Sequence, residues 1–145
     1  MNVIYPRTKT VFLAGTIDNG DSTNWQEELI DMCQYKDIVF FNPRRKDWLG
    51  EFSKEELEYQ IKWEQEHLDS ADTIVMCLLD NSKSPISLLE LGLYAQSDKL
   101  IVFCTNKFYR FDNVRLTCEK YGIPLVNSTK TKDIIQEVKT VMDKI

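Results

Sequence analysis

Short apolar runs alternate along the chain with longer segments of helical period, and this alternation constrains the fold more than any other feature. The apolar runs lie at residues 10–14, 37–41, 73–79, 100–104 and 123–126. Each run is apolar on both faces, as is typical of parallel strands covered by helices on both sides. The helical segments lie at residues 24–35, 54–70, 85–97, 113–121 and 131–144. This repetition predicts an α/β fold, a doubly wound five-stranded parallel sheet of the flavodoxin or Rossmann type with helices on both faces.

Length and charge narrow the classes of function. A chain of 145 residues fits one compact domain and leaves little room for a second, so we expect a single domain over residues 1–145. The formal net charge of −5 gives no broad attraction to nucleic acid. The amino-terminal segment holds no apolar run long enough for a signal peptide or a membrane span. We therefore expect a cytoplasmic protein that binds small molecules, and neither nucleic acid nor membranes.

The cysteines and the histidine do not form a metal-binding pattern. The four cysteines are scattered, without a CxxC pair, at Cys33, Cys77, Cys104 and Cys118. Three of them lie in or beside apolar runs, where cysteine usually acts as a small apolar residue. The single histidine, His67, is interpreted as an exposed helix residue. The sequence therefore predicts a reduced protein without a structural zinc, and no metal or organic cofactor.

The segment after the third apolar run carries the first candidate functional acid. Ser84 followed by Pro85 predicts a helix start, with the serine as N-cap. The helix that follows is apolar almost all round, so we expect it to pack on the sheet on one side and on a second subunit on the other. Glu90 lies within it, and such a glutamate costs free energy unless it is paired, hydrogen-bonded or protonated. Glu90 is therefore either a functional group or a surface glutamate that falls between leucines. Gly92 permits close approach of another group.

Glu64 is the second candidate acid. It falls on an apolar stripe of the helix at residues 54–70, together with Leu57, Ile61 and Leu68. Glu64 either pairs with a cation or serves chemistry. Two carboxylates in apolar surroundings favour retaining glycosyl transfer, in which one attacks the anomeric carbon and the other protonates the departing group.

Three polar loops follow predicted strands, where parallel sheets bind ligands. Gly15 and Thr16 follow the first run, where small residues let the backbone approach a ligand. The basic run Arg44-Arg45-Lys46 follows the second, and it either holds a phosphate or base or is a solvated group of charges. Asn113 lies in a polar segment after the fourth run that enters a helix.

Three segments of the chain carry a resemblance to a known family. They read FLAGTI, WEQEHLDSAD and SPISLLELGLYA. In this order and spacing they resemble the nucleoside 2-deoxyribosyltransferase superfamily, which includes the deoxyribonucleoside 5′-monophosphate N-glycosidases. The likeness runs from about residue 9 to about residue 126. It implies a doubly wound α/β domain that forms dimers or larger oligomers.

The resemblance also implies roles for individual residues. Glu90, in a Glu-Leu-Gly triplet, matches the family nucleophile that forms a covalent deoxyribosyl intermediate. Glu64 stands where the family has an aspartate that helps protonate the base, a departure that is one methylene longer. Thr16 matches a serine that helps bind phosphate, and Ser84 matches a serine that the monophosphate enzymes carry where the nucleoside transferases have an aspartate. Asn113 resembles a residue that a neighbouring subunit lends to the 5′ end of the sugar.

Together these features predict cleavage or exchange of the N-glycosidic bond of a 2′-deoxynucleoside or its 5′-monophosphate. Gly15, Thr16, Ser84, Asn113 and Arg44 are the expected binding residues, in a homodimer or larger homo-oligomer. Hydrolysis and transfer to another base both remain open. Two further alternatives are a non-catalytic nucleotide-binding module and a hydrolase of another N-glycoside, such as a ribonucleotide or an NAD-like compound.

Overall fold

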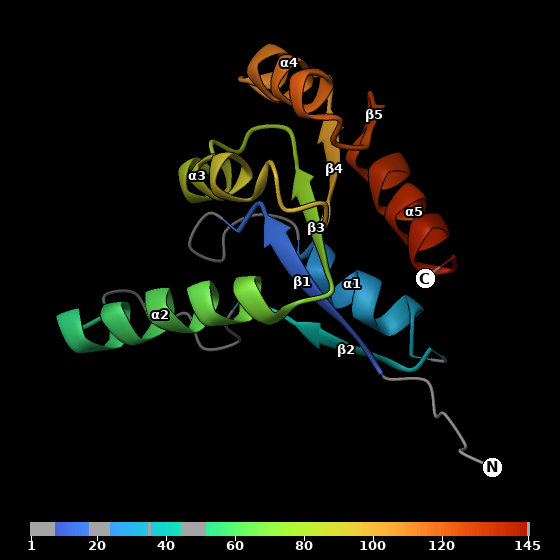
Figure 1. The fold of residues 1–145 in the computed structure, drawn as a ribbon. Coiled ribbons are helices and arrows are strands. Elements are labelled where there is room, and N and C mark those ends of the chain that lie inside the picture. Colours follow the sequence, from blue (N-terminus) through green and yellow to red (C-terminus); the bar gives the residue numbers. More distant parts are fainter. Residues whose placement is uncertain (1–7, 18–23, 35, 45–51, 145) are drawn as a thin grey trace.

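The structure is a computed structural model that describes residues 8–17, 24–34, 36–44 and 52–144. Figure 1 shows strands and helices in strict alternation along these residues. The strands are β1 (Lys9–Gly15), β2 (Ile38–Phe41), β3 (Thr73–Leu78), β4 (Leu100–Thr105) and β5 (Leu125–Ser128). The helices are α1 (Trp25–Met32), α2 (Lys54–Ser70), α3 (Pro85–Tyr94), α4 (Phe111–Tyr121) and α5 (Thr131–Met142).

The five strands form one sheet in the order β2-β1-β3-β4-β5, and every neighbouring pair is parallel. The chain leaves β1 for β2 on one side and later returns to place β3 on the other side of β1. The strand order therefore reverses between β1 and β3, which is where sheets of this kind bind ligands. The predicted fold class, a doubly wound parallel sheet, is confirmed.

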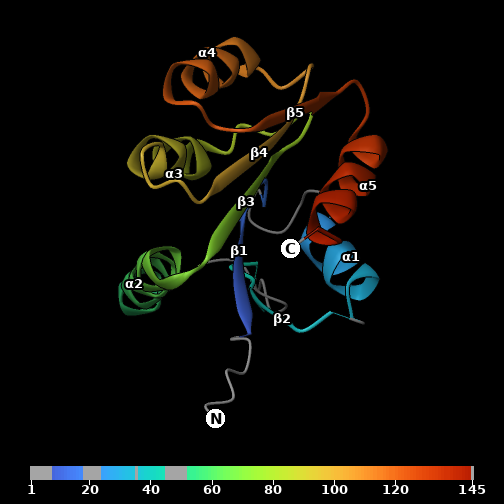
Figure 2. The same ribbon diagram turned by 45° about the vertical axis from the view of Figure 1, so that its right-hand side comes forward.

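Helices cover both faces of the sheet, as Figure 2 shows: α2, α3 and α4 lie on one side, and α1 and α5 on the other. Two apolar clusters fill the two interfaces. Side chains alternate along each strand, so Ile74 and Met76 of β3 belong to one cluster and Val75 and Cys77 to the other. Burial on both faces explains why the strands read as continuous apolar runs.

Some boundaries differ from the predicted ones. The last strand begins at Leu125 rather than at residue 123, because Pro124 contributes only its carbonyl, which accepts a hydrogen bond from Val102 N at 2.9 Å. α3 ends at Tyr94, three residues before the predicted end, and a turn follows in which Asp98 has a φ of 63°. α4 begins at Phe111, two residues before the predicted start.

The predicted stripe on α2 is wrong in its first half. Leu68 is buried, whereas Leu57 and Ile61 are exposed, and Figure 1 shows this half of α2 pointing away from the other elements. Only the last turns of the helix pack on the sheet. There His67 is half-buried rather than exposed, with its ring stacked 4.2 Å from that of Trp63, and its Nδ1 lies 2.7 Å from Trp63 O.

Within the described ranges, no helix combines the length and the apolar character that a membrane span requires. The same residues contain no group of three or more histidine, cysteine or acidic side chains placed to hold a metal ion. All four cysteines are buried and unpaired.

Candidate functional site

Three of the predicted binding residues lie at the carboxyl edge of the sheet, because each follows a strand of the parallel set. Thr16 follows β1, Arg44 follows β2 and Ser84 precedes α3 in the connection from β3. The structure brings Thr16 and Ser84 into direct contact, with 3.1 Å between Oγ1 and Oγ. This contact lies at the reversal of strand order, so the predicted location of the site agrees with the topology.

The Thr16–Ser84 contact belongs to a row of three hydroxyl groups. Besides its contact with Thr16, Ser84 Oγ lies 2.5 Å from Ser82 Oγ. At the other end, Thr16 Oγ1 accepts a hydrogen bond of 3.0 Å from the backbone N–H of Leu79. All three side chains are buried. We call Thr16, Ser84 and Ser82 the hydroxyl row.

Ser84 is the N-cap of α3 by position, and Pro85 occupies the first turn as predicted. Its hydroxyl nevertheless makes no cap hydrogen bond. Ser84 has the left-handed backbone conformation, with a φ of 45°, and its hydroxyl bonds to the hydroxyl row instead. A non-glycine residue adopts this conformation only at a cost in free energy, so surrounding contacts must hold it there.

The close packing of β1 against β3 explains why position 15 is a glycine, without reference to a ligand. Its φ is +126°, and a Cβ on it would lie 2.1 Å from the carbonyl oxygen of Cys77. Gly15 pairs with Cys77 across β1 and β3, so the two backbones meet where a side chain has no room. The expected role of Gly15 beside a ligand stays a prediction.

Arg44 is only 8% exposed, so a solvated charge is the wrong interpretation of this residue. Its Nη1 lies 3.5 Å from Gln26 Oε1. Gln26 Nε2 in turn donates to the carbonyl oxygen of Thr16 at 3.3 Å. A buried cation is thus linked through one amide to the strand end that carries the hydroxyl row. Arg45 and Lys46 lie outside the described residues.

Glu90 is buried, with 8% of its surface exposed, so it is not a surface glutamate between leucines. Burial and, to a lesser extent, the nearby carboxylate of Glu64 together raise the pKa of Glu90 to about 8. Glu64 is half-buried on α2, and burial raises its pKa to about 7. In the described part of the chain, neither carboxylate has a hydrogen bond or an ion pair, so the structure gives no support to a pairing of Glu64 with a cation.

Two neighbouring carboxyl groups with raised pKa values titrate as a unit. In such a pair one group is able to keep its proton while the other ionises, because two negative charges close together are unfavourable. One oxygen is then able to act as a nucleophile while the other carboxyl acts as a proton donor. Retaining glycosyl transfer needs the same two kinds of group, a carboxylate and a carboxylic acid.

Asn113 is exposed on α4. It lines a groove of about 310 Å³ between α3 and α4, beside Gly92 and Arg110. The lining of this groove includes neither Thr16 nor Ser84. A Cβ on Gly92 would have no atom within 4 Å, so the groove is open at that point.

Sequence reasoning missed Ser82 and Gln26. The sequence does contain a pattern that could have indicated Ser82, because two serines separated by one residue stand in the turn between a strand and a helix. Gln26 is fully buried, yet it sits one residue from a helix start, where a polar side chain is ordinarily taken as exposed. Only the contact with Thr16 and Arg44 reveals its place in the site.

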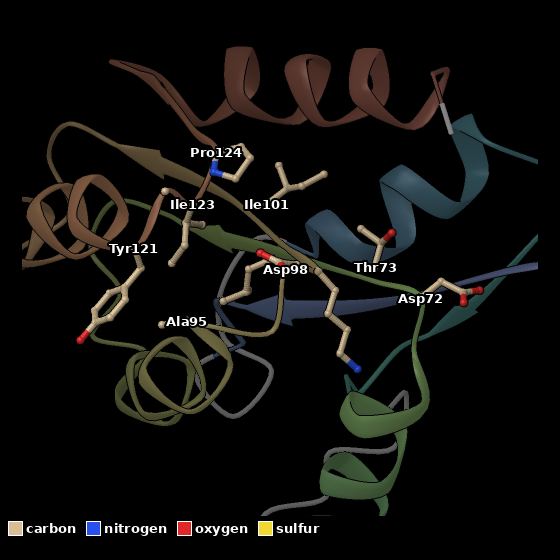
Figure 3. A pocket seen from close by; sticks show the side chains of 11 residues that line it. Asp72, Thr73, Ala95, Asp98, Ile101, Tyr121, Ile123 and Pro124 are labelled. Atoms are coloured by element: carbon tan, nitrogen blue, oxygen red, sulfur yellow. The ribbon is translucent and has the colours of Figure 1, made fainter.

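A second hollow, of about 390 Å³, lies at the opposite, amino edge of the sheet (Figure 3). Its main polar groups serve the fold. Asp72 accepts hydrogen bonds from the backbone N and Oγ1 of Thr10. Lys99 Nζ donates to the carbonyl oxygens of Leu68, Asp69 and Ala71 at the end of α2. The carboxyl edge is therefore the better candidate site.

A family model and a solved structure match this chain. Residues 8–108 match the family described as nucleoside 2-deoxyribosyltransferase like. The fold is similar to that of the CMP N-glycosidase BcmB of Clostridium botulinum, with a TM-score of 0.59 and 18% sequence identity. That likeness covers 91% of this chain and 99% of the other. No protein of curated function matches the sequence significantly.

Proposed function

The chain belongs to the nucleoside 2-deoxyribosyltransferase-like family and is an enzyme of N-glycosidase type, and from this premise we propose its substrate and mechanism. The substrate is a 2′-deoxynucleoside 5′-monophosphate or the corresponding 2′-deoxynucleoside. The observation that carries the proposal is the pair of neighbouring carboxyl groups, Glu90 and Glu64, whose pKa values are both raised by burial.

The first step requires the proton of the pair to lie on Glu64 in the substrate complex, although burial raises the pKa of Glu90 more than that of Glu64 in the free chain. A carboxylate oxygen of Glu90 then attacks C1′ of the sugar. A C1′–O bond forms as the C1′–N bond breaks, and the electron pair of the broken bond leaves with the base. The Glu64 carboxyl gives its proton to the departing base. In the second step, water or another base attacks C1′ and releases the sugar from Glu90. The attacking water or base gives up a proton to the Glu64 carboxylate, which restores the starting state.

The 5′ end of the sugar lies at the hydroxyl row in this proposal, with Gly15 beside it. Neutral hydroxyl groups and the buried guanidinium of Arg44 favour an anionic 5′ group, whereas a carboxylate there would repel it. The name of the structurally similar protein, a CMP N-glycosidase, also supports a monophosphate substrate.

A second copy of the chain completes the site in this proposal. Ile86, Leu89 and Leu93 are more than half exposed on one side of α3, and their spacing places them on one stripe. Exposed apolar stripes of this kind mark protein interfaces. The groove that Asn113 lines adjoins α3, the helix that carries Glu90. A second subunit that docks on this stripe therefore places the Asn113 of that subunit near α3 of the first.

A ribonucleotide is the second candidate substrate, because the similar protein BcmB is named for CMP. The described residues near Glu90 do not distinguish a 2′-hydroxyl from a 2′-hydrogen. Competition between matched 2′-deoxy and 2′-hydroxy monophosphates decides between the two.

The direct test is chromatographic. Purified protein is incubated with each deoxynucleoside, each deoxynucleoside monophosphate and each ribonucleoside monophosphate, with and without a competing base. We expect free base from deoxynucleoside monophosphates, and none from the Glu90→Ala variant. A new nucleoside formed from the competing base identifies transfer. If none of the substrates releases base, the proposal is wrong and a non-catalytic nucleotide-binding module is favoured.

A further inference from the structure

We propose that Ser82 is a positioning residue that makes the site selective for a 5′-phosphate over a 5′-hydroxyl, and this inference rests on the proposed function. Ser82 does not need to touch the substrate for this role. It acts through Ser84, whose Oγ lies 2.5 Å from its own.

The hydroxyl row fixes the direction in which Ser84 presents its proton and lone pairs. The row has three hydroxyl protons, and two of them are used in the bonds between its members. Thr16 is anchored at one end, since its Oγ1 also accepts the backbone N–H of Leu79. Ser84 stands in the middle and is held from both sides. Without the Ser82 hydroxyl, Ser84 is held from one side only and its hydroxyl is able to rotate.

The backbone of the turn between β3 and α3 shows that surrounding contacts hold Ser84 in place. Asn81 and Ser84 both have positive φ values, 62° and 45°, which L-residues adopt at a cost in free energy. Burial and the two hydrogen bonds of Ser84 offset this cost. Because the Ser84 hydroxyl does not cap α3, its orientation depends on the hydroxyl row alone among the contacts seen in the structure.

This arrangement suits a phosphate better than a hydroxyl group. A phosphate carries several acceptor oxygens and gains charge-assisted hydrogen bonds from oriented donors. A sugar 5′-hydroxyl accepts and donates equally well, so it loses less when Ser84 rotates. The substitution of Ser82 therefore weakens monophosphate binding selectively.

The test compares Ser82→Ala and Ser82→Thr with wild type, using a deoxynucleoside monophosphate and its unphosphorylated deoxynucleoside. For Ser82→Ala we expect KM for the monophosphate to rise about tenfold, as for the loss of alignment of one charge-assisted hydrogen bond. We expect kcat to change little, and KM for the deoxynucleoside to rise much less than KM for the monophosphate. Ser82→Thr keeps a hydroxyl and restores KM. Ser70→Ala, an exposed serine at the end of α2, is the matched control.

Binding of inorganic phosphate gives a second readout that does not need turnover. We expect phosphate to raise the Tm of wild type and to raise that of Ser82→Ala less. If the enzyme turns over substrate and Ser82→Ala keeps the full preference for monophosphates, the inference is wrong while the proposed function stands. If no substrate turns over, the proposed function fails, and the phosphate shift alone decides: equal shifts in both proteins overturn the inference, and a smaller shift in Ser82→Ala supports it.

Discussion

Thr16 Oγ1 lies 3.1 Å from Ser84 Oγ, so a single hydrogen bond joins the segment after β1 to the turn before α3, 68 residues further along the chain. The same Thr16 oxygen accepts the N–H of Leu79, and the Thr16 carbonyl accepts from Trp25 Nε1 at 3.0 Å. One residue thus connects three segments at the point where the strand order reverses. Its side chain has a role in stability as well as in the proposed site.

Thr16 and Thr105 provide a matched pair for measuring that role. Thr16→Val leaves the Leu79 N–H buried without its acceptor, which costs about 1–3 kcal/mol of the free energy of unfolding. Thr105 is also fully buried, but its Oγ1 has no hydrogen-bond partner in the described structure. Thr105→Val therefore removes a desolvation cost and should leave Tm unchanged or raise it. Urea denaturation and Tm measurements check both, and a drop in Tm for Thr105→Val as large as that for Thr16→Val contradicts the expectation.

Gly15 is predicted to tolerate no side chain, whereas Gly92 tolerates one in the isolated chain. A Cβ on Gly15 would lie 2.1 Å from Cys77 O, so Gly15→Ala must separate β1 from β3, at a cost on the order of 3 kcal/mol or more. Gly92→Ala meets no atom within 4 Å and gains up to about 1 kcal/mol of helix propensity. Soluble yield and Tm of the two variants give the answer. An equal loss in both would show that Gly92 is packed in the assembled protein.

The stability of the protein should fall as the pH rises through neutrality. In the unfolded chain Glu90 loses its proton near its ordinary pKa of 4.5, whereas in the folded chain it keeps the proton until about pH 8. Between these values the unfolded state binds fewer protons, so the free energy of unfolding decreases with pH. Glu90→Gln removes this contribution, on the order of 3 kcal/mol at pH 8. Urea denaturation at pH 5 and pH 8 measures it, with the exposed Glu58→Gln as control. Wild type should lose more stability between these pH values than Glu90→Gln does, and equal losses in the two proteins contradict the buried-carboxyl interpretation.

Glu64 is predicted to matter most when the base is a poor leaving group. Glu64→Gln keeps the size of the side chain but has no proton to give, so cleavage of an ordinary deoxynucleotide should slow by about a hundredfold or more. In a 7-methylguanine nucleotide the departing base already carries a positive charge and needs no added proton. Cleavage of this nucleotide should therefore slow far less. The alkaline limb of the pH–rate profile, which reports loss of the Glu64 proton, should also vanish. Equal losses for both substrates would assign Glu64 a positioning role instead.

Much of the fold was predictable because burial on both faces of a parallel sheet leaves a plain apolar signature in each strand. The helix start after Ser84 and the unusual setting of Glu90 were predictable for a related reason, because each residue stands out against its surroundings: Glu90 is an acid among leucines and Ser84 precedes a proline. The errors share a different cause. Leu57, Ile61 and His67 lie on a helix that packs on the sheet only at its end, and helical period does not reveal how far a helix overlaps its sheet.

The contacts inside the site were not predictable from the sequence. The Ser84 hydroxyl takes part in the hydroxyl row rather than capping α3, because a left-handed backbone turns it away from the helix. Gln26 contacts Thr16 and Arg44 from α1, and nothing in the local pattern links those segments. Such contacts depend on three-dimensional proximity between residues far apart in the chain.

The proposed contribution of Asn113 from a second subunit can be tested by mixing inactive variants. Glu90→Ala and Asn113→Ala should each be inactive or nearly so as homodimers. In a mixed dimer, one site carries both defects and the other carries neither, so co-expression of the two variants should recover roughly a quarter of wild-type activity. The control is a mixture of Glu90→Ala with Glu64→Ala. These two acids come from one protomer, as the effect of Glu64 on the pKa of Glu90 within a single chain shows, so no site in that mixture is intact. Recovery in the first mixture alone establishes a shared site, whereas no recovery in either places Asn113 outside the partner's site.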